Sequence, residues 1–474
     1  MTVSSRSAPR LVVAGQAGDA GKTIVSLALL LAWRRSGVSV QPFKKGPDYI
    51  DSAWLAWAAG QPARNLDTYL MGADTVRSAF ARHALSGGVN LVEGNRGLFD
   101  GFDTAGTHST AELAKLLRAP VILVVNAAKV TRTVAAVVLG CQKFDPDLNL
   151  AGVVLNRVNG KRHERIVRAC IEQSCGIPVV GVLPKIEAAD LVPERHLGLV
   201  TPAEHGPTAA LESGLLQHMA PGLDLDRLFK IAGAATPIVP IEEQERELPD
   251  LRGVKIGFLQ DSAFTFYYAE NLETLERGGA ELVPISALEA SQVPSVLHAL
   301  YIGGGFPETH GDRLAANTAF LASLRAAAQD GLPIYAECGG LMLLSQAIRW
   351  RGQRSVMAGV LPFEVEVCAA MQGHGYAELL VDSPNPFYPP GTRLRGHEFH
   401  YSRVAVQSEP PATACQVVRG TGCWAGRDGV TINNVWASYT HLHALATPEW
   451  VSGFASAAAR RKRASAASQK QALG

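Results

Sequence analysis

The sequence contains no apolar run long enough to span a bilayer, and its first ten residues are polar, without the apolar core of a signal peptide. Its 7 cysteines are scattered, and none forms a C-x-x-C pair or a Cys/His cluster with the spacing of a metal site. The formal net charge is only +1, which argues against nucleic acid or an anionic membrane as a bulk partner. Together these absences predict a cytoplasmic protein with reduced cysteines that binds neither membrane nor nucleic acid.

A chain of 474 residues is too long for one hydrophobic core, so we expect two or three domains. The regular apolar pattern weakens between about residues 224 and 251, where a glutamate-rich stretch follows two prolines, Pro237 and Pro240. This composition is typical of an interdomain linker. The predicted boundaries are a disordered N-terminus at 1–9, a first domain at 10–228, a linker at 229–252, a second domain at 253–456 and a disordered basic tail at 457–474. A frayed helix end is the alternative for that tail.

A glycine-rich loop follows the first expected strand, residues 11–15, and precedes a helix expected at 24–35. The order strand, glycine loop, Gly-Lys-Thr and helix is typical of a P-loop, in which backbone N–H groups surround a phosphate, the lysine reaches the outer phosphates and the threonine hydroxyl contacts Mg²⁺. The spacing is unusual because the position six before Lys22 is Gln16, and a chance Gly-Lys-Thr before a helix is the alternative. The candidate nucleotide-binding residues in this loop are Gly18, Gly21, Lys22 and Thr23, of which Thr23 is also a candidate metal ligand.

Charged side chains follow two further expected strands. Lys44, Asp48 and Asp51 come after the second strand, and Glu93 ends the third. At the carboxyl ends of parallel strands, lysines suit phosphate charge and carboxylates suit Mg²⁺. These residues therefore extend the predicted nucleotide site, with Asp48 and Glu93 as metal ligands. The alternatives are a solvated charged turn and, at Glu93, a tight capped turn.

Apolar β-rich segments alternate with helical segments through the rest of the first half. They are strands at 121–126, 151–156 and 177–184 and helices at 107–117, 131–142 and 162–173. This alternation predicts a parallel α/β sheet. Asn156, at the end of one strand, is a candidate adenine contact, although an asparagine that caps a strand end explains it equally well.

Cys338 lies between a short apolar strand, 333–337, and an apolar helix that begins with two glycines. Small residues, Ala336 and Gly340, stand two places on either side of it, as a sharp strand-to-helix turn requires. This arrangement predicts a nucleophile elbow, whose helix N–H groups can lower the thiol pKa and hold a developing oxyanion. A buried cysteine beside a glycine turn is the alternative.

Two other segments favour the catalytic interpretation. A glycine loop at 303–305 can supply oxyanion N–H groups, and His441 lies about a hundred residues after Cys338, where a base is needed. The three segments together resemble a class I, triad-type glutamine amidotransferase, which hydrolyses glutamine through a cysteinyl thioester. The resemblance implies that Cys338 is the nucleophile and His441 the base. Many such domains carry a glutamate two residues after the histidine, but that position is His443 here, so we predict only a dyad.

Eight motifs, in the same order along the chain, resemble the cobyrinate a,c-diamide synthase family (CobB/CbiA). They lie at 43–51, 64–67, 93–101, 261–272, 303–308, 337–340, 396–402 and 438–443. The resemblance covers about residues 10 to 455. It implies a dethiobiotin-synthetase-like P-loop domain followed by a class I glutamine amidotransferase domain.

The family amidates two peripheral carboxylates of a corrin precursor in cobalamin biosynthesis. The resemblance implies that ATP converts a carboxylate into an acyl phosphate, which ammonia then attacks. By the same resemblance Lys22 and Lys44 neutralise the transferred phosphoryl group, and Thr23, Asp48 and Glu93 surround Mg²⁺. The expected small-molecule partners are ATP, Mg²⁺, L-glutamine and a tetrapyrrole carboxylic acid, a corrin first. The oligomeric state is left open, with a homodimer as one alternative.

Two alternatives to a corrin-amidating enzyme remain. Lys45 replaces the usual small residue of the Phe-Lys-x-Gly motif, and Phe-Lys-Lys-Gly-Pro resembles relatives that amidate sirohaem or nickel-sirohydrochlorin with the same architecture. The sequence therefore leaves the tetrapyrrole ring open. An alternative of another class is a P-loop regulatory ATPase with a silent glutaminase-like domain.

Overall fold

The computed structural model describes residues 8–185, 194–195, 198–206, 209–238, 250–405 and 410–473, and the chain divides into two compact units, 1–244 and 245–474. The division falls inside the segment predicted as a linker, although α10 (Leu225–Gly233) extends into that segment. The predicted disordered N-terminus lies outside the described residues except for residues 8 and 9. Of the described helices, none combines the length and the apolar character that a membrane span requires.

Within the described part of the first unit, seven parallel strands form a sheet in the order β3-β2-β4-β1-β5-β6-β7. Its central strands are rich in valine, leucine and isoleucine and are buried on both faces, as expected for a parallel sheet between helical layers. The carboxyl ends of β1, β2 and β4 lie side by side, so the loops that follow them meet. The strands are β1 Arg10–Gly15, β2 Val40–Lys45, β3 Arg64–Leu66, β4 Val89–Gly97, β5 Val121–Asn126, β6 Leu150–Val158 and β7 Val179–Pro184.

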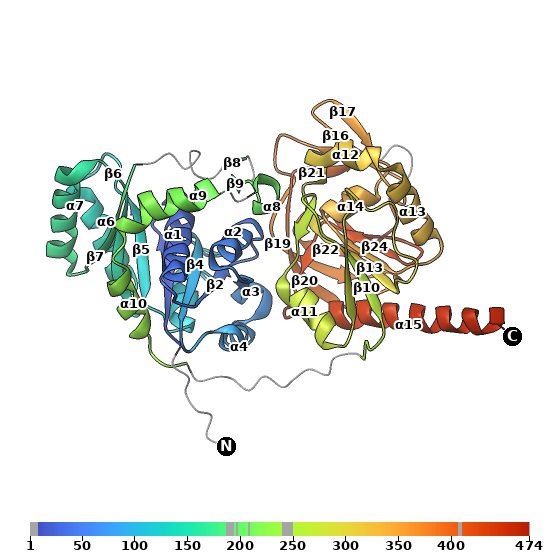
Figure 1. The fold of residues 1–474 in the computed structure, drawn as a ribbon, viewed down its shortest axis with the longest axis horizontal. Helices are drawn as coiled ribbons and strands as arrows, with labels where there is room; N and C mark the ends of the chain where they lie inside the picture. Colours follow the sequence, from blue (N-terminus) through green and yellow to red (C-terminus); the bar gives the residue numbers. More distant parts are fainter. Residues whose placement is uncertain are drawn as a thin grey trace, which may run out of the picture. The chain divides into compact units, whose positions relative to one another are not determined.

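The helices of the first unit follow the strands in βα order, and α6 and α7 lie beside one another next to β6 and β7 (Figure 1). The first helix begins directly after Gly21, whose φ of 96° is a left-handed conformation that glycine adopts without strain. Short elements at 194–222 complete the unit: β8 Glu194–Arg195, β9 Gly198–Leu199, α8 Pro202–His205, α9 Ala209–Gly214, η2 Leu215–Met219 and η3 Ala220–Gly222. The remaining helices are α1 Lys22–Arg35, α2 Ile50–Ala59, α3 Thr68–Met71, α4 Ala73–His83, α5 Thr110–Leu116, α6 Arg132–Phe144 and α7 Gly160–Cys175.

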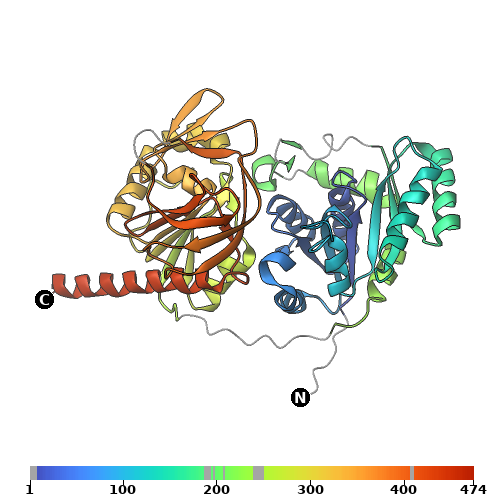
Figure 2. The ribbon, with the colours of Figure 1, turned by 180° about the vertical axis from the view of Figure 1, so that it is seen from behind.

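In the described part of the second unit, ten strands form a sheet in the order β12-β10-β13-β15-β24-β23-β22-β19-β20-β25. The first five are parallel and the rest antiparallel, and Figure 2 shows this sheet from behind. The strands are β10 Lys255–Leu259, β12 Glu281–Ile285, β13 Ala299–Ile302, β15 Ile334–Glu337, β19 Gly373–Val381, β20 Arg393–His400, β22 Thr413–Arg419, β23 Arg427–Ile432, β24 Val435–Ser438 and β25 His441–Leu442.

Two smaller sheets flank the large one. β11 (Phe264–Phe266) pairs with β14 (Gly304–Gly305), and β16 (Ala347–Trp350) lies between β17 (Gln353–Val356) and β18 (Glu364–Val367). β18 in turn pairs with β21 (Ser402–Ala405). The helices of this unit are η4 Pro307–His310, α11 Ala269–Arg277, α12 Gly311–Ala316, α13 Thr318–Gln329 and α14 Gly339–Leu344, with α15 at the C-terminus.

Hydrophobic clusters cover both faces of the second unit's sheet. One cluster is rich in aromatic rings, and Tyr335 stacks on Trp436 with ring centroids 6.2 Å apart and an interplanar angle of 5°. Tyr301 packs against Trp450 of the C-terminal helix at 5.3 Å. Large aromatic side chains bury much apolar area each, so this cluster fixes the strands that carry the site described below.

For residues 457–474 the sequence left two alternatives, a frayed helix end and a disordered tail, and the residues that the structure describes there, 457–473, are helical. Helix α15 (Pro448–Leu473) continues through this segment (Figure 1). Trp450 anchors its first turn in the core, and farther along Lys462 Nζ donates a hydrogen bond to the carbonyl oxygen of Arg252 at 2.6 Å. Alanine, lysine and arginine favour a helix, and the core anchor nucleates it, which composition alone does not reveal.

Candidate active site

The glycine loop after β1 surrounds the side chain of Lys22. Its ammonium donates hydrogen bonds to the carbonyl oxygens of Ala17 and Gly18, both at 3.2 Å, and of Arg96 at 2.8 Å. Burial and the nearby Lys44 ammonium lower the pKa of Lys22. Lysine at this position is therefore a buried cation held by backbone carbonyls, which is suited to receive the charge of a phosphate.

Lys44 lies between two carboxylates at the ends of β2 and β4. Its Nζ atom is 2.7 Å from Oε1 of Glu93 and 2.6 Å from Oδ2 of Asp51. Lys44 and Glu93 are register partners of neighbouring parallel strands, which explains why residues 49 positions apart meet. Burial alone would lower the pKa of Lys44, but the two carboxylates raise it above its ordinary value. The ammonium is therefore charged and fixed in place.

Asp48 and Asp51 lie together at the start of α2. The backbone N–H of Asp51 donates a hydrogen bond to Oδ1 of Asp48 at 2.9 Å. Burial and the carboxylate of Asp51 raise the pKa of Asp48 to about 7. Against the effect of burial, the ammonium of Lys44 holds the pKa of Asp51 below its usual value. One of the two carboxyl groups therefore exchanges its proton near neutral pH.

The residues beside Glu93 fit a magnesium ion. Its Oε2 atom is buried and accepts no hydrogen bond from the residues that the structure describes, and Thr23 Oγ1 donates to its Oε1 at 3.1 Å. Asp48 is near enough for its charge to interact with that of Glu93. Within the described ranges, no three His, Cys, Asp or Glu side chains form a metal cluster. Magnesium commonly keeps several water ligands and takes one or two protein carboxylates, so this donor set suits it.

Asn156 lies behind the glycine loop. Its Nδ2 donates to the carbonyl oxygen of Ala20 at 2.9 Å, and its Oδ1 accepts from the N–H of Arg157. A Cβ atom on Gly21 would lie 2.1 Å from Nδ2 of Asn156, so only glycine fits there. These contacts give Asn156 a role in supporting the loop, and its predicted adenine contact stays a prediction.

The second set of predicted residues lies in the other unit, where β15 ends at Glu337 and α14 begins at Gly339. Between them Cys338 has φ 49° and ψ −100°, an uncommon backbone conformation for a residue with a side chain. Its N–H donates to the carbonyl oxygen of Ser438 at 2.7 Å, which ties the turn to β24. A Cβ atom on Gly340 would lie 2.5 Å from the carbonyl oxygen of Ile302, so a small residue is required there. These features form a nucleophile elbow.

The glycine loop after β13 lies between the elbow and the histidine. A Cβ atom on Gly304 would lie 2.6 Å from Cε1 of His441, and one on Gly339 would lie 3.0 Å from the backbone nitrogen of Gly305. The N–H of Gly303 donates a hydrogen bond to the hydroxyl oxygen of Tyr267 at 2.8 Å. Of the three glycines whose N–H groups were predicted as oxyanion donors, Gly303 is therefore not available to bind an oxyanion.

His441 is buried, at 2% exposure, among polar side chains. Its Nδ1 atom is 3.4 Å from Oε2 of Glu337, and its ring stacks on that of His397 with centroids 5.0 Å apart. The Nδ1 atom of His397 lies 3.2 Å from the hydroxyl of Tyr268. Burial and the two neighbouring histidines, His441 and His443, lower the pKa of His397 well below its ordinary value, so its ring is neutral.

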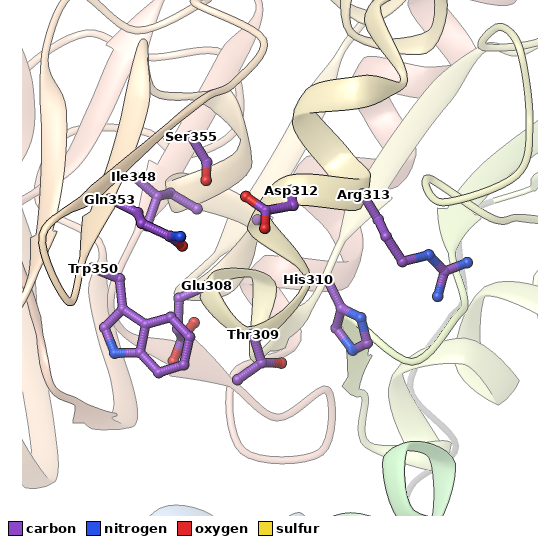
Figure 3. A pocket seen from close by; sticks show the side chains of 10 residues that line it. Glu308, Thr309, His310, Asp312, Arg313, Ile348, Trp350, Gln353 and Ser355 are labelled. Carbon is purple, nitrogen blue, oxygen red and sulfur yellow. The ribbon is translucent and has the colours of Figure 1, made fainter.

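Beside the elbow, η4, α12 and the β16–β17 hairpin enclose a cavity of about 250 Å³. In Figure 3, Trp350 and Gln353 of the hairpin face Glu308 and Asp312 across this space. Glu308 links the cavity to the elbow, because its charge acts on the Cys338 thiol. The sequence motif at 303–308 contains Glu308, but nothing in its spacing indicates the cavity, because the β16–β17 hairpin that completes the lining lies much later in the chain.

The sequence predicted that helix N–H groups lower the pKa of the Cys338 thiol, but the net shift of that pKa is upward. Burial, and to a lesser extent the charge of Glu308, raises the pKa of Cys338 above its ordinary value, while a hydrogen bond from the N–H of Gly339 opposes the shift. The thiol is 6% exposed. Desolvation outweighs one backbone dipole, so the resting cysteine keeps its proton and needs a base to become a nucleophile.

We expect Lys44→Met to destabilise the first unit by about 3 to 5 kcal/mol, because it leaves the fully buried Glu93 without its cation. Lys115→Met is the matched control. Lys115 also contacts two carboxylates, Glu112 at 2.8 Å and Asp145 at 2.7 Å, but it is 29% exposed, so its removal should cost less than about 1 kcal/mol. Urea unfolding of both variants measures the difference, and equal losses would contradict the buried-pair interpretation.

Because its pKa is raised, Cys338 should lose its proton only above the ordinary thiol range. We expect its alkylation by iodoacetamide, followed by mass spectrometry of its peptide, to keep accelerating up to about pH 9 without a plateau. Glu308→Gln removes a neighbouring negative charge and should speed alkylation about two- to tenfold at a fixed pH. Asp312→Asn, in the same cavity, serves as the control. A plateau below about pH 8 would show that the resting thiol is already ionised.

Two family models match the chain, one in each unit. Residues 11–200 match the CobQ/CobB/MinD/ParA nucleotide binding domain, and residues 255–449 match the CobB/CobQ-like glutamine amidotransferase domain. These matches confirm the predicted fold class, in which a P-loop domain with a parallel sheet precedes a class I glutamine amidotransferase domain.

Named relatives match nearly the whole chain. The cobyrinate a,c-diamide synthase of Magnetococcus marinus is 42% identical over 447 residues, which cover 93% of this chain and 95% of the relative. Those of Archaeoglobus fulgidus and Syntrophotalea carbinolica are 37% and 40% identical and cover 96% and 93% of this chain, and 98% and 97% of their own lengths. Because the identity extends through both units, the chain belongs to the cobyrinate a,c-diamide synthase family.

Proposed function

We propose that this chain amidates the a and c carboxylates of cobyrinate, or of hydrogenobyrinate, using ATP and glutamine. The observation that supports the proposal is that each unit holds one set of candidate reactive groups, in a chain related to these synthases along its length. The first unit holds Lys22, Lys44, Thr23 and Glu93 around a glycine loop. The second holds Cys338 at an elbow beside the loop that contacts His441.

The first unit prepares the acid. A carboxylate is a poor acyl donor to ammonia because its leaving group would be oxide, so ATP transfers its γ-phosphoryl group to the carboxylate, giving an acyl phosphate and ADP. Ammonia then forms the C–N bond and phosphate leaves. Lys22 and Lys44 are the buried cations that neutralise the charge of the transferred group. Their rigid placement by backbone carbonyls and by the carboxylates of Asp51 and Glu93 removes the need to reorganise during transfer.

Thr23, Glu93 and Asp48 are the residues that would hold magnesium, which supplies charge neutralisation between the nucleotide phosphates. Lys44 satisfies one oxygen of Glu93 and leaves the other without a hydrogen-bond donor among the described residues. The proton shared by Asp48 and Asp51 would have to leave before Asp48 could act as a ligand.

The second unit releases ammonia. His441 takes the thiol proton, and Cys338 attacks the side-chain carbonyl carbon of glutamine. His441 then gives the proton to the departing amide nitrogen, so that the C–N bond breaks to leave a thioester and ammonia. Water then hydrolyses the thioester to glutamate. The N–H of Gly339 hydrogen-bonds the sulfur at the start of α14, beside the place where the oxyanion develops. Ammonia must reach the acyl phosphate unprotonated, which is a physical reason to join the two units in one chain.

We expect mass spectrometry to show two carboxyl-to-amide conversions on cobyrinate after incubation with the full chain, ATP, Mg²⁺ and glutamine. Hydrogenobyrinate, sirohaem and nickel-sirohydrochlorin, each incubated separately, discriminate between the rings, because Lys45 makes the motif resemble that of the sirohaem-amidating relatives. If only sirohaem or nickel-sirohydrochlorin is converted, the proposed amidation reaction stands and the proposed substrate is wrong. Conversion of none of the four would overturn the proposal.

Cys338→Ala should abolish amidation supported by glutamine and preserve amidation supported by free ammonium, because only the ammonia source is lost. Lys22→Ala should reduce the glutamine-supported and the ammonium-supported rates by about a thousandfold or more, because the transferred phosphoryl group loses a cation. The loop carbonyl oxygens hold that cation in place at 2.8 to 3.2 Å. Steady-state rates with each nitrogen donor measure the two effects. Loss of both activities in Cys338→Ala would contradict the assignment of the two reactions to separate sites.

A further inference from the structure

We propose that Glu337, the residue immediately before the nucleophile, is the positioning residue that orients His441 for glutamine hydrolysis. This inference rests on the proposed function. The sequence leaves the third member of the glutaminase machinery unassigned, because the position two residues after the histidine is His443 and not an acid. The structure places a buried carboxylate from another part of the chain against the histidine.

Glu337 and His441 face each other out of solvent. Oε2 of Glu337 is 3.4 Å from Nδ1 of His441, and the side chains are 0% and 2% exposed. A carboxylate at Nδ1 favours the tautomer that carries its proton there, which leaves Nε2 to accept the thiol proton. The same carboxylate stabilises the imidazolium that forms after the transfer. Catalytic hydrogen bonds are commonly longer in the absence of substrate, so 3.4 Å suits this role.

The carboxylate of Glu337 is itself held by two donors. The hydroxyl of Tyr301 donates to Oε2 at 2.9 Å, and the N–H of Leu442 donates to Oε1 at 3.1 Å. Leu442 follows His441 directly, so the acid is anchored to the short strand that carries the base. Asn271 extends the network, because its Nδ2 donates to the carbonyl oxygen of Leu442 at 2.8 Å. A group fixed at this many points orients its partner without further adjustment.

The other acid near these histidines has a different partner. Oε2 of Glu270 lies 3.5 Å from Nε2 of His443, which occupies the position of the missing glutamate. His443 stacks on Tyr268 with ring centroids 4.4 Å apart. Glu270 and His443 thus form a separate acid–histidine pair, and Glu270 offers a matched control for a change at Glu337: the same residue type, also buried, beside a histidine that is not the base.

Glu337→Gln should lower the glutamine-supported turnover number about 10²- to 10⁴-fold while the ammonium-supported rate stays near that of the wild type. The acidic limb of the pH profile of glutamine-supported kcat/KM should move to lower pH, because loss of the negative charge makes His441 easier to deprotonate. Glu337→Asp keeps the charge and should restore part of the rate. Glu270→Gln should leave the glutamine-supported turnover number and the acidic limb of the pH profile unchanged. If Glu337 only supported the structure, Glu337→Gln would not shift that acidic limb.

Tyr301→Phe is the second variant, which removes one donor to Glu337 without altering its charge. We expect a fall of about three- to tenfold in the glutamine-supported rate alone. Wild-type glutamine turnover and an unshifted acidic limb in Glu337→Gln would overturn the inference and leave the proposed function standing. If Glu337→Gln does not fold, an unchanged rate in Tyr301→Phe overturns it instead. Absence of glutamine hydrolysis in the wild-type chain, with ATP and tetrapyrrole present, would overturn the proposed function.

Discussion

A charge that is taken out of water must have a partner, and both candidate sites of this chain depend on that constraint. In the first unit the ammonium of Lys44 is buried between Glu93 and Asp51. In the second, the carboxylate of Glu337 is buried among Tyr301, Leu442 and His441. Each group can occupy only one position without losing its partners. The contacts that offset the cost of burying these charges therefore also hold the candidate site residues in fixed geometry, and stabilisation of developing charge requires such a geometry.

Parallel strands bring these partners together in both units. In the first unit, Lys44 on β2 and Glu93 on β4 are register partners. In the second, Glu337 on β15 pairs with Ser438 on β24, and His441 follows Ser438 by three residues. In an open parallel sheet, binding sites form beside the carboxyl ends of the strands, at the point where the strand order reverses. The chain thus uses one architectural rule twice, once to collect cations and carboxylates and once to collect a thiol, an imidazole and an acid.

Much of the framework could be predicted from local pattern. The strand at 121–126 has the predicted bounds, and the glycine loop, its lysine and the cysteine turn lie where the spacing placed them, because each is encoded within a few consecutive residues. The sequence left the C-terminal segment open between a helix end and disorder, because its anchor, Trp450, acts through the core and not through local composition. The net direction of the Cys338 pKa shift was missed for a related reason: a backbone dipole is visible in sequence, whereas desolvation depends on everything packed around the thiol.

The sequence by itself determined the two-part α/β plan, the order of the eight motifs and the types of the candidate site residues, since periodicity and short motifs are local properties of the chain. Only the tertiary structure decided which acid meets His441, why Gly303 is unavailable as an oxyanion donor, and how Asn156 supports the glycine loop. These are contacts between residues 36 to 136 positions apart. Their pairing follows from strand register and burial, which arise when the sheets assemble and which no single segment carries.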